Sequence, residues 1–349
     1  MSEQPTLTWP DLITRLISGQ DLASSDTAWA MNQVMSGNAS PVALAGFLVA
    51  LRAKGETVAE LRGLADSMLD HAVTIDVPGP AVDIVGTGGD RAFTVNISTM
   101  ASLAIAAAGV RVVKHGNRAS SSKSGSADVL EALGVNLKLP VAEIEQVAGE
   151  VGIAFLFAQV FHPSMRHAAV ARRELGVATV FNFLGPLTNP AKPRGAAIGC
   201  ADVRMAPIMA GVLAGRSQNG LVFRGESDGL DELAATGPSR IWEVRDGEIT
   251  EHLLDAAADL GLDRIELAQL RGGDAAHNAQ VARQVLAGQD GPIRQTVLLN
   301  AAAGIVAEGT HPAIPQGGDL KARLGAGIVQ AASAIDSGAA ADLLERWCA

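Results

Sequence analysis

The stretch AVDIVGTGGD, residues 81–90, is a short apolar run that ends in glycines, and it predicts a strand followed by a tight turn. The next segment, STMASLAIAAAG (98–109), predicts a helix that ends at its glycine, and VRVVKHG (110–116) predicts a second strand rich in β-branched residues. A strand, a helix and a strand within about 30 residues form a βαβ unit, which implies a parallel sheet. We therefore expect an α/β domain.

The residues before this unit have a different pattern. Residues 1 to about 72 predict helices only. Ser40 and Pro41 are typical of the start of one helix, and Thr57 with Glu60 forms the capping box of the next. After a proline-containing linker, strand and helix patterns alternate to the C-terminus.

Composition excludes several classes of protein. The chain has 349 residues, of which 48% are hydrophobic and 18% charged, so it can bury a large core in one or two domains. Its net charge of -10 disfavours a general binder of nucleic acid or anionic membranes, because such binding depends on Lys and Arg. Two cysteines without a CxxC motif argue against a disulfide framework or a zinc site. We expect a cytoplasmic protein, since neither a signal peptide nor an apolar run of about 18 residues is found.

Two glycine-rich loops follow the predicted strands. They are GTGGD (86–90) and HGNRASSSKSGS (115–126). Parallel sheets bind ligands beyond the carboxyl ends of their strands, and the backbone N–H groups of glycine turns hold anions. The helix that begins near NIST (96–99) adds its positive N-terminus. Neither loop matches GxxxxGK[ST] or GxGxxG, which disfavours a P-loop or a dinucleotide site.

The charges around these loops favour phosphate. No acid lies between Asp90 and Asp128, whereas Lys114, Arg118 and Lys123 do. A single GTGGD is usually only a tight turn, and a serine-rich loop is usually solvated. Two such loops at one edge of a sheet, flanked by cations, predict a phosphate site.

Three further groups have a structural and a functional interpretation. Asp231 and Glu232 form either a solvated acidic turn or, beside a pyrophosphate, a Mg2+ site. His162 either caps a helix within the core or faces a ligand. Arg172 and Arg173 either lie on a solvated face, or one of them binds a substrate carboxylate.

Taken together, the motifs resemble the anthranilate phosphoribosyltransferase family, in the nucleoside phosphorylase-like class of phosphoribosyltransferases. The resemblance extends from the helical N-terminus to GGDAAHNA (272–279). It implies transfer of the phosphoribosyl group of 5-phosphoribosyl-1-pyrophosphate (PRPP) to the amine of anthranilate, which gives N-(5-phosphoribosyl)anthranilate and pyrophosphate in tryptophan biosynthesis. The motifs are, in chain order, GTGGD, NIST, KHGNR, SKSGSADVLEALG, FHPSMRH, ARRELG, FNFLGPLTNP and GLDEL.

The resemblance also implies an architecture. A small all-helical domain, residues 1–72 with about 163–190, lies against a larger α/β domain, residues 73–162 and 191–349. The larger domain has a mainly parallel central sheet flanked by helices. The family pattern implies a homodimer through the helical domain and two Mg2+ ions per active site, with PRPP and anthranilate as substrates and no nucleic-acid or membrane partner.

Roles carry over at matching positions. Lys114 and Arg172 are the implied catalytic residues: the first stabilises the departing pyrophosphate, and the second holds the carboxylate of anthranilate. Asn117 would also bind anthranilate, and His162 would line its channel. Ser98 would contact one Mg2+, and Asp231 with Glu232 would hold the other. The residues implied to contact PRPP are Gly86, Gly89, Asp90, Thr94, Asn96, Ile97, Ser98, Thr99, Lys114, His115, Gly116, Asn117, Arg118, Ala119, Ser120, Ser121, Ser122 and Ser126.

Two positions depart from the family pattern, and three alternatives remain. Ala178 stands where Arg is expected, and Arg224 stands where His is common. A pyrimidine nucleoside phosphorylase shares the fold, but the intact KHGNR and GLDEL favour the transferase. A non-catalytic nucleic-acid-binding relative is disfavoured by the net charge and the metal pair. A purely structural helical protein would gain nothing from two glycine loops at strand ends.

Overall fold

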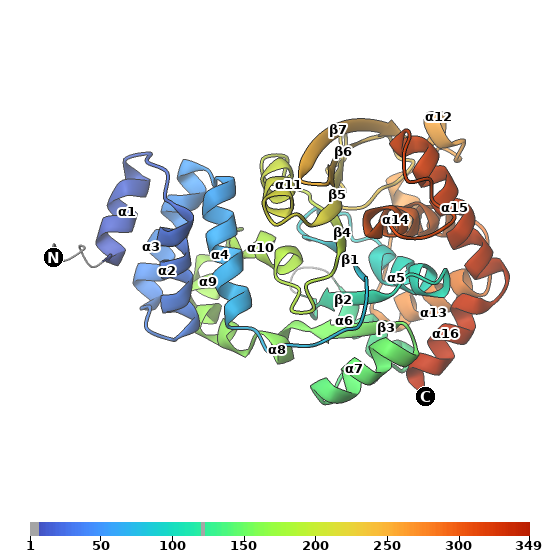
Figure 1. The fold of residues 1–349 in the computed structure, drawn as a ribbon, viewed down its shortest axis with the longest axis horizontal. Coiled ribbons are helices and arrows are strands. Elements are labelled where there is room, and N and C mark those ends of the chain that lie inside the picture. Colours follow the sequence, from blue (N-terminus) through green and yellow to red (C-terminus); the bar gives the residue numbers. More distant parts are fainter. Residues whose placement is uncertain (1–6, 120–122) are drawn as a thin grey trace.

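The computed structural model describes residues 7–119 and 123–349, and its N-terminal part is a group of helices (Figure 1). The side chain of Ser40 accepts a hydrogen bond from the N–H of Ala43, and Thr57 forms the predicted capping box with Glu60. Apolar residues of these helices form a common core. The four helices are α1 (Trp9–Ile17), α2 (Ser24–Met35), α3 (Pro41–Lys54) and α4 (Val58–Asp70).

A seven-stranded sheet forms the centre of the larger part, in the order β3-β2-β1-β4-β5-β6-β7. The first five strands in this order are parallel, and β6 and β7 add an antiparallel hairpin at one edge. This confirms the predicted combination of a helical part with a mainly parallel α/β part. The strands are β1 (Val82–Gly86), β2 (Val112–Gly116), β3 (Ile153–Phe157), β4 (Gly195–Gly199), β5 (Asn219–Gly225), β6 (Pro238–Arg245) and β7 (Glu248–Asp255).

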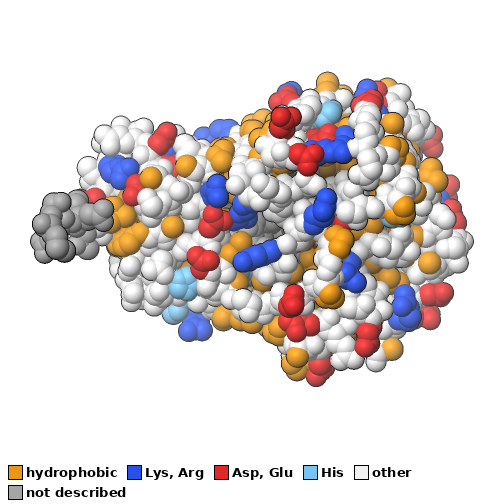
Figure 2. Space-filling view, in the orientation of Figure 1, with side chains coloured by type: hydrophobic (Ala, Val, Ile, Leu, Met, Phe, Trp, Pro, Cys, Tyr) orange, Lys and Arg blue, Asp and Glu red, His pale blue; other side chains and the backbone are white. Residues whose placement is uncertain are grey.

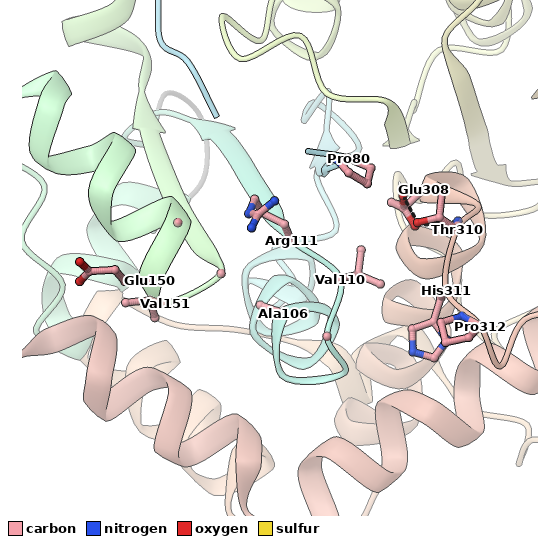
Figure 3. Close-up of a pocket in the computed structure, with 13 residues that line it drawn as sticks. Pro80, Ala106, Val110, Arg111, Glu150, Val151, Glu308, Thr310, His311 and Pro312 are labelled. Atoms are coloured by element: carbon pink, nitrogen blue, oxygen red, sulfur yellow. Dashed lines mark hydrogen bonds between the residues drawn. The ribbon is translucent and has the colours of Figure 1, made fainter. Parts of the chain in front are cut away.

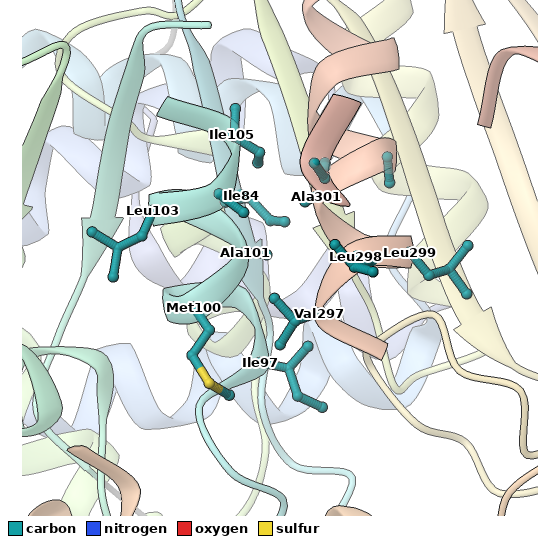
Figure 4. Packing of buried hydrophobic residues seen from close by; sticks show 14 of the residues in the cluster. Ile84, Ile97, Met100, Ala101, Leu103, Ile105, Val297, Leu298, Leu299 and Ala301 are labelled. Atoms are coloured by element: carbon teal, nitrogen blue, oxygen red, sulfur yellow. The ribbon is translucent and has the colours of Figure 1, made fainter. Parts of the chain in front are cut away.

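One face of the sheet is covered by α5 (Ile97–Ala107) and α14 (Pro292–Glu308). Both helices are almost entirely buried, which matches their lack of a polar face. Figure 4 shows their side chains meeting over Ile84 of β1. The other helices of this part are α6 (Ser126–Leu133), α7 (Val141–Glu150), α12 (Ala256–Leu260), η3 (Leu267–Leu270), α13 (Ala275–Leu286), α15 (Leu320–Asp336) and α16 (Ala339–Cys348).

The opposite face of the sheet shares its core with the helical part. Ile198 and Val222 point to this side, whereas their neighbours Ala197 and Leu221 belong to the core under α5 and α14. The strands are thus apolar on both faces, as a covered parallel sheet requires. On this side α7 packs Ile144 and Ala148 beside Val113 and Leu156. The other helices on this side are α8 (Ala158–Phe161), η1 (Pro163–Ala168), α9 (Ala169–Leu175), α10 (Phe181–Leu184), η2 (Gly185–Leu187) and α11 (Met205–Gly215).

The central helices lie against the N-terminal ones. Ala168, Phe181 and Leu184 belong to the same apolar core as Leu44 and Leu64. This core also continues onto the sheet, so the domain limits at residues 72 and 190 stay a prediction. In the described residues, no helix combines the length and the apolar character that a membrane span requires.

Candidate active site

The topology brings the two glycine loops to one edge of the sheet. The first follows β1 and the second follows β2, and these two strands are parallel neighbours. On its other side β1 pairs with β4, so the strand order reverses direction at β1. Doubly wound sheets bind ligands at such a reversal, beyond the carboxyl ends of the strands. The segment with Asp231 and Glu232 follows β5 at the same edge.

Asp231 contacts the first loop directly. Its Oδ2 accepts a hydrogen bond from the N–H of Gly88 at 2.6 Å. A Cβ atom on Gly86 would lie 2.5 Å from that same oxygen, and one on Gly199 would lie 1.6 Å from the backbone oxygen of Asp231. Glycine is therefore required at position 199, where the backbone of β4 passes so close to that of the acidic segment, and a side chain at position 86 would have to displace the carboxylate of Asp231.

Glu232 reaches the start of α5. Its Oε1 accepts a hydrogen bond from the N–H of Ser98 at 3.3 Å, so a carboxylate faces the helix N-terminus. The Oγ of Ser98 accepts a hydrogen bond from Nζ of Lys114 at 3.2 Å. Nζ also donates to the backbone oxygen of Ile84 at 2.5 Å, and the lysine is 1% exposed. Residues from β1, β2, α5 and the acidic segment thus meet in one cluster.

The electrostatics of this cluster favour added positive charge. Burial raises the pKa of Glu232 to about 8, although Lys114 opposes the rise. Burial and the nearby carboxylates of Asp90 and Glu232 raise the pKa of Asp231 well above its ordinary value. Burial lowers the pKa of Lys114, against the attraction of Asp83 and Glu232. Buried carboxylates outnumber the cations beside them, and a divalent cation would correct this imbalance.

The oxygen ligands in this cluster fit a Mg2+ ion that is bound by few protein groups, rather than a metal site in which the protein supplies every ligand. Among the residues that the structure describes, no three His, Cys, Asp or Glu side chains form a ready metal cluster. Mg2+ is usually held by one or two carboxylates and completed by phosphate oxygens and water. Asp231, Glu232 and the hydroxyl of Ser98 supply hard oxygen donors of this kind.

Other residues of the first loop contribute mainly through their backbone. Oδ1 of Asp90 accepts a hydrogen bond from the N–H of Ala92, and Gly89 has a positive φ of 90°. The side chains of Ile97 and Thr99 are buried in the core. Their N–H groups lie in the first turn of α5 and already donate to backbone oxygens, that of Ile97 to Val95 at 2.8 Å and that of Thr99 to Asn96 at 3.2 Å.

The second loop is held against α6. The backbone oxygen of Asn117 accepts hydrogen bonds from the N–H of Ala127 and from Oγ of Ser126. A Cβ atom on Gly116 would lie 2.4 Å from that same Oγ, so the loop leaves β2 in close contact with the helix. The predicted contacts Ser120, Ser121 and Ser122 lie outside the described residues.

The charge of Arg118 is already paired. Its guanidinium lies 2.9 Å from Oδ1 of Asp128 and 2.8 Å from Oε2 of Glu131. The same Asp128 accepts hydrogen bonds from the N–H groups of Ala119 and Gly125. The side chain of Arg118 is thus directed toward α6, which leaves the buried Lys114 and the exposed Lys123 as the other cations predicted for this loop.

Two buried histidines lie between the parts of the molecule. Nδ1 of His115 contacts the backbone oxygen of Gly185 at 3.0 Å, and Nε2 of His162 contacts that of Thr188 at 2.8 Å. Their ring centroids are 5.2 Å apart. Burial lowers the pKa of His115 to about 3 and also lowers the pKa of His162. Both rings are therefore neutral at pH 7, and each donates its proton to a loop carbonyl.

Arg172 has an unusual environment for an arginine. It is half-buried on α9, and its guanidinium lies 5.2 Å from the ring centroid of Phe181. Burial lowers its pKa, and within residues 7–119 and 123–349 no carboxylate pairs with it. A partly desolvated cation without an acidic partner is suited to binding an anionic ligand. Figure 2 shows Lys and Arg side chains gathered over the junction between the helical part and the sheet-containing part.

Comparison with known proteins decides the family. A model for the a/b domain of a glycosyl transferase family matches residues 78–341, and a model for its helical bundle domain matches residues 10–72. The anthranilate phosphoribosyltransferase of Arthrobacter sp. (strain FB24) is 59% identical over 342 residues, which are 98% of this chain and 96% of that protein. The chain belongs to the anthranilate phosphoribosyltransferase family. The resemblance inferred from the motifs is confirmed.

Solved structures of the family share the whole fold. The anthranilate phosphoribosyltransferase of Thermus thermophilus has a TM-score of 0.88 and 43% identity, covering 97% of this chain and 98% of its own. The Saccharomyces cerevisiae enzyme, in complex with PRPP and Mg, has a TM-score of 0.85 and 28% identity, with 97% and 96% covered. Its complex with 4-fluoroanthranilate has a TM-score of 0.83 and 26% identity, with 98% of each chain covered.

The two departures from the family motifs are not hydrogen-bonded to this cluster in the described residues, although the guanidinium of Arg224 borders Gly229, two residues before Asp231. Ala178 is exposed in the segment after α9. Arg224 lies at the end of β5, and its guanidinium is 3.6 Å from Oε1 of Glu226. Neither residue has a contact with Asp231, Glu232 or Lys114 among the hydrogen bonds and ion pairs of the described residues.

The structure also contains a buried polar network that the sequence motifs did not predict. Nδ2 of Asn189 donates to Oδ2 of Asp83 at 2.8 Å and to the backbone oxygen of Val113 at 2.7 Å. Oδ1 of Asp83 accepts from the N–H of His115 at 3.2 Å. Burial raises the pKa of Asp83 to about 6, although Lys114 opposes the rise. In the sequence, this network was indicated only by Asp83, an acidic residue inside the apolar run AVDIVG.

A cavity of about 390 Å³ lies at the opposite edge of the sheet (Figure 3). It is lined by residues just before the parallel strands, among them Pro80, Val110 and Gly152. Its charged groups are already satisfied: Nε of Arg111 donates to the backbone oxygen of Ala148, and Glu308 accepts hydrogen bonds from its neighbour Thr310. The predicted site residues of the family are at the other edge, so this cavity has no part in the site.

Proposed function

We propose that this protein transfers the phosphoribosyl group of PRPP to the amine of anthranilate, giving N-(5-phosphoribosyl)anthranilate and pyrophosphate. The proposal rests on one observation: the buried pair Asp231 and Glu232 is hydrogen-bonded both to the first glycine loop and to the start of α5. The Saccharomyces cerevisiae relative, solved with PRPP and Mg, supports this assignment.

The cluster at the strand ends would bind PRPP. The positive N-terminus of α5 and Nζ of Lys114 would attract the phosphate oxygens. Most described N–H groups of the loops already have partners within the protein, as Gly88 has Asp231. We propose that Ser98 contacts one Mg2+ and that Asp231 with Glu232 holds a second. Bound Mg2+ would neutralise the charge that accumulates on the departing pyrophosphate.

The reaction then depends mainly on charge and position. The bond between the ribose carbon and pyrophosphate breaks, which leaves positive character on the ribose and negative charge on the leaving group. Lys114 is fixed by hydrogen bonds to Ile84 and Ser98, so its ammonium is held in place before the charge develops. Such preorganised charge stabilises a transition state without reorganisation.

Arg172 would orient the acceptor. An unpaired guanidinium on α9 can bind the carboxylate of anthranilate, so that the amine faces the ribose carbon. The aromatic amine is weakly basic and already neutral at pH 7, so its lone pair attacks the ribose carbon without a strong general base. As the N–C bond forms, the nitrogen loses one proton to the departing pyrophosphate or to water. Asn117 would contribute to the same site, and His162 would line the path to it. The complex of the Saccharomyces cerevisiae relative with 4-fluoroanthranilate supports binding of an anthranilate in this fold.

We also propose a homodimer formed through the helical part. Ile17, Val42 and Val49 are 75%, 84% and 47% exposed, and all three lie on α1 and α3. The side chain of Ile13 lies 3.3 Å from the place that a Cβ on Gly46 would take, so α1 and α3 pack against each other. Exposed apolar surface of this kind is typical of a subunit interface. A cytoplasmic location stays a prediction.

A direct assay tests the function. Purified protein is incubated with PRPP and anthranilate, with and without Mg2+, and the product is detected by its mass and by the loss of anthranilate. Mg2+-dependent formation of phosphoribosylanthranilate is expected. Phosphorolysis of uridine or thymidine instead would establish the pyrimidine nucleoside phosphorylase. Binding of duplex DNA or RNA at about 150 mM salt, without either activity, would favour the non-catalytic relative.

A further inference from the structure

The segment between η3 and α13 runs beside the first loop of the site. The N–H of Val95 donates to the backbone oxygen of Leu270 at 2.9 Å, and the N–H of Gly272 donates to that of Phe93 at 2.8 Å. Between these bonds, Thr94 forms an antiparallel bridge with Arg271. A segment far along the chain thus acts as a short strand that holds the residues just before α5.

Asn278 extends this contact by side-chain hydrogen bonds. It lies in the first turn of α13 and is 2% exposed. Its Oδ1 accepts from the N–H of Gly273 at 2.8 Å, and its Nδ2 donates to Oδ1 of Asn96 at 2.8 Å. Nδ2 of Asn96 then donates to the backbone oxygen of Ser124 at 3.1 Å, in the second glycine loop.

The direction of each hydrogen bond in the series from Gly273 through Asn278 and Asn96 to Ser124 is fixed by the two ends of the series. The N–H of Gly273 can only donate, so Oδ1 of Asn278 must face it. The backbone oxygen of Ser124 can only accept, so Nδ2 of Asn96 must face that end. The bond between the two asparagines then has one possible polarity, which agrees with the observed one. Only a side chain with both a donor and an acceptor can make both of these hydrogen bonds at position 278.

We propose that Asn278 is a positioning residue for the PRPP site. Through Asn96, which precedes α5, it fixes the start of that helix relative to the second glycine loop. The start of α5 is where Ser98 meets Glu232 and Lys114, so a displaced Asn96 would displace the groups assigned to the pyrophosphate and its metal. This inference rests on the proposed function and deepens it, because it concerns the part of the site that binds PRPP and not the part that binds anthranilate.

The substitution Asn278→Asp keeps the acceptor of this side chain and removes its donor. The aspartate keeps its size and still accepts from Gly273, but it cannot donate to Oδ1 of Asn96. If the amide of Asn96 turned to donate to the aspartate, its oxygen would face the backbone oxygen of Ser124. We expect the KM for PRPP to rise about tenfold, the effect of one lost buried hydrogen bond. The KM for anthranilate should change less than about twofold, because Arg172 is on another element.

Calorimetric titration of PRPP with Mg2+, in the absence of anthranilate, gives a second measurement and should show the same loss of affinity. Ala282→Gly is the matched control, since it weakens the same helix at a buried position without removing a polar contact. It should lower the melting temperature and leave both KM values near those of the wild type.

A double-mutant cycle tests whether Asn278 acts through Asn96. Asn96→Ala with Asn278→Ala should bind PRPP no more weakly than Asn96→Ala alone. Additive losses, or equal increases in both KM values, would overturn the proposal. If Asn278→Asp fails to fold, the residue is purely structural, and the proposal is also overturned. A wild-type protein without transferase activity would instead reject the proposed function, whereas an active wild type with unchanged variants would reject this inference alone.

Discussion

The N–H of Gly88 donates to Oδ2 of Asp231 at 2.6 Å, across 143 residues of sequence. This bond joins the glycine turn after β1 to the acidic segment after β5. It leaves no room for a side chain at Gly86. The first glycine loop, predicted to bind phosphate, and the acidic pair, predicted to hold Mg2+, are therefore parts of one site. A substitution in either the loop or the acidic segment can disturb the geometry of both.

The first prediction concerns Gly86. Gly86→Ala should displace the carboxylate of Asp231, because the new Cβ would lie 2.5 Å from Oδ2. We expect a loss of about 1–3 kcal/mol in the free energy of unfolding, typical of overpacking, together with a higher Mg2+ requirement. Denaturant unfolding and Mg2+ titration of the rate measure the two effects. Gly149→Ala, in helix α7, is the control, since a Cβ there meets nothing within 4 Å. It should leave the Mg2+ requirement unchanged and should not lower the free energy of unfolding, because alanine favours a helix over glycine.

The second prediction concerns the acidic pair. Asp231→Asn combined with Glu232→Gln removes both carboxylate charges and nearly preserves their shape. The Mg2+ concentration for half-maximal rate should rise at least about tenfold, a loss that even outer partners of a metal can cause. Stability should not fall, because the pair is buried with raised pKa values and too little compensating charge. Asp246→Asn, at an exposed carboxylate between β6 and β7, is the control, and an unchanged Mg2+ dependence in the double variant would reject the metal role.

The third prediction concerns the acceptor. Arg172→Ala should raise the KM for anthranilate about 10- to 100-fold, the range for a lost hydrogen bond to a charged group. The KM for PRPP should stay near the wild-type value, since Lys114 and the loops are untouched. Arg173→Ala changes an exposed neighbour and should have little effect. If both arginine variants bind anthranilate as the wild type does, another residue must hold the carboxylate.

The fourth prediction is a pH dependence of stability. The pKa of His115 falls from its ordinary 6.5 to about 3 in the folded protein, mainly through burial. Between these values the unfolded chain binds a proton that the folded chain does not, so the contribution of His115 to stability is lost as the pH falls below 6.5. The buried carboxylates of Asp83 and Glu232, whose pKa values are raised, change stability in the opposite direction. The slope should approach about 1.4 kcal/mol per pH unit for this group, and His162 adds to it in the same direction.

Comparing variants isolates the contribution of His115 to this slope. Relative to the wild type, His115→Gln should gain stability as the pH falls from about 7 to 4, because the contribution lost on acidification is absent from the variant. His167→Gln, at an exposed histidine, is the control. Melting temperatures between about pH 4 and 7 provide the measurement. Parallel curves for His115→Gln and the wild type would contradict the assignment of a neutral, buried ring.

The fifth prediction concerns assembly. Val42→Glu places a charge on an exposed apolar position of α3 and should convert the proposed dimer into a monomer, as judged by light scattering on a size-exclusion column. Val329→Glu changes a valine of α15 that is 61% exposed, and it should not alter the mass. A wild-type protein that already elutes as a monomer at micromolar concentration would reject the dimer.

Local patterns in the sequence predicted much of the fold. The βαβ unit from Val82 to Gly116 was predicted because strand, helix and turn signals act over a few residues. The caps at Ser40 and Thr57 were predicted for the same reason. The orientation of Arg118 was not, because a charge count cannot tell whether a guanidinium faces the loop or the acids of α6.

By itself, the sequence determined the family, the alternation of strands and helices, and the residue types at the strand ends. Only the tertiary structure decided which of them meet: Gly88 with Asp231, Asn189 with Asp83, and Asn278 with Asn96, pairs that are 143, 106 and 182 residues apart. Secondary structure follows from short-range preferences that can be read along the chain. The partners of a buried polar group depend instead on how distant segments pack, and each such group must find a partner wherever the fold places one.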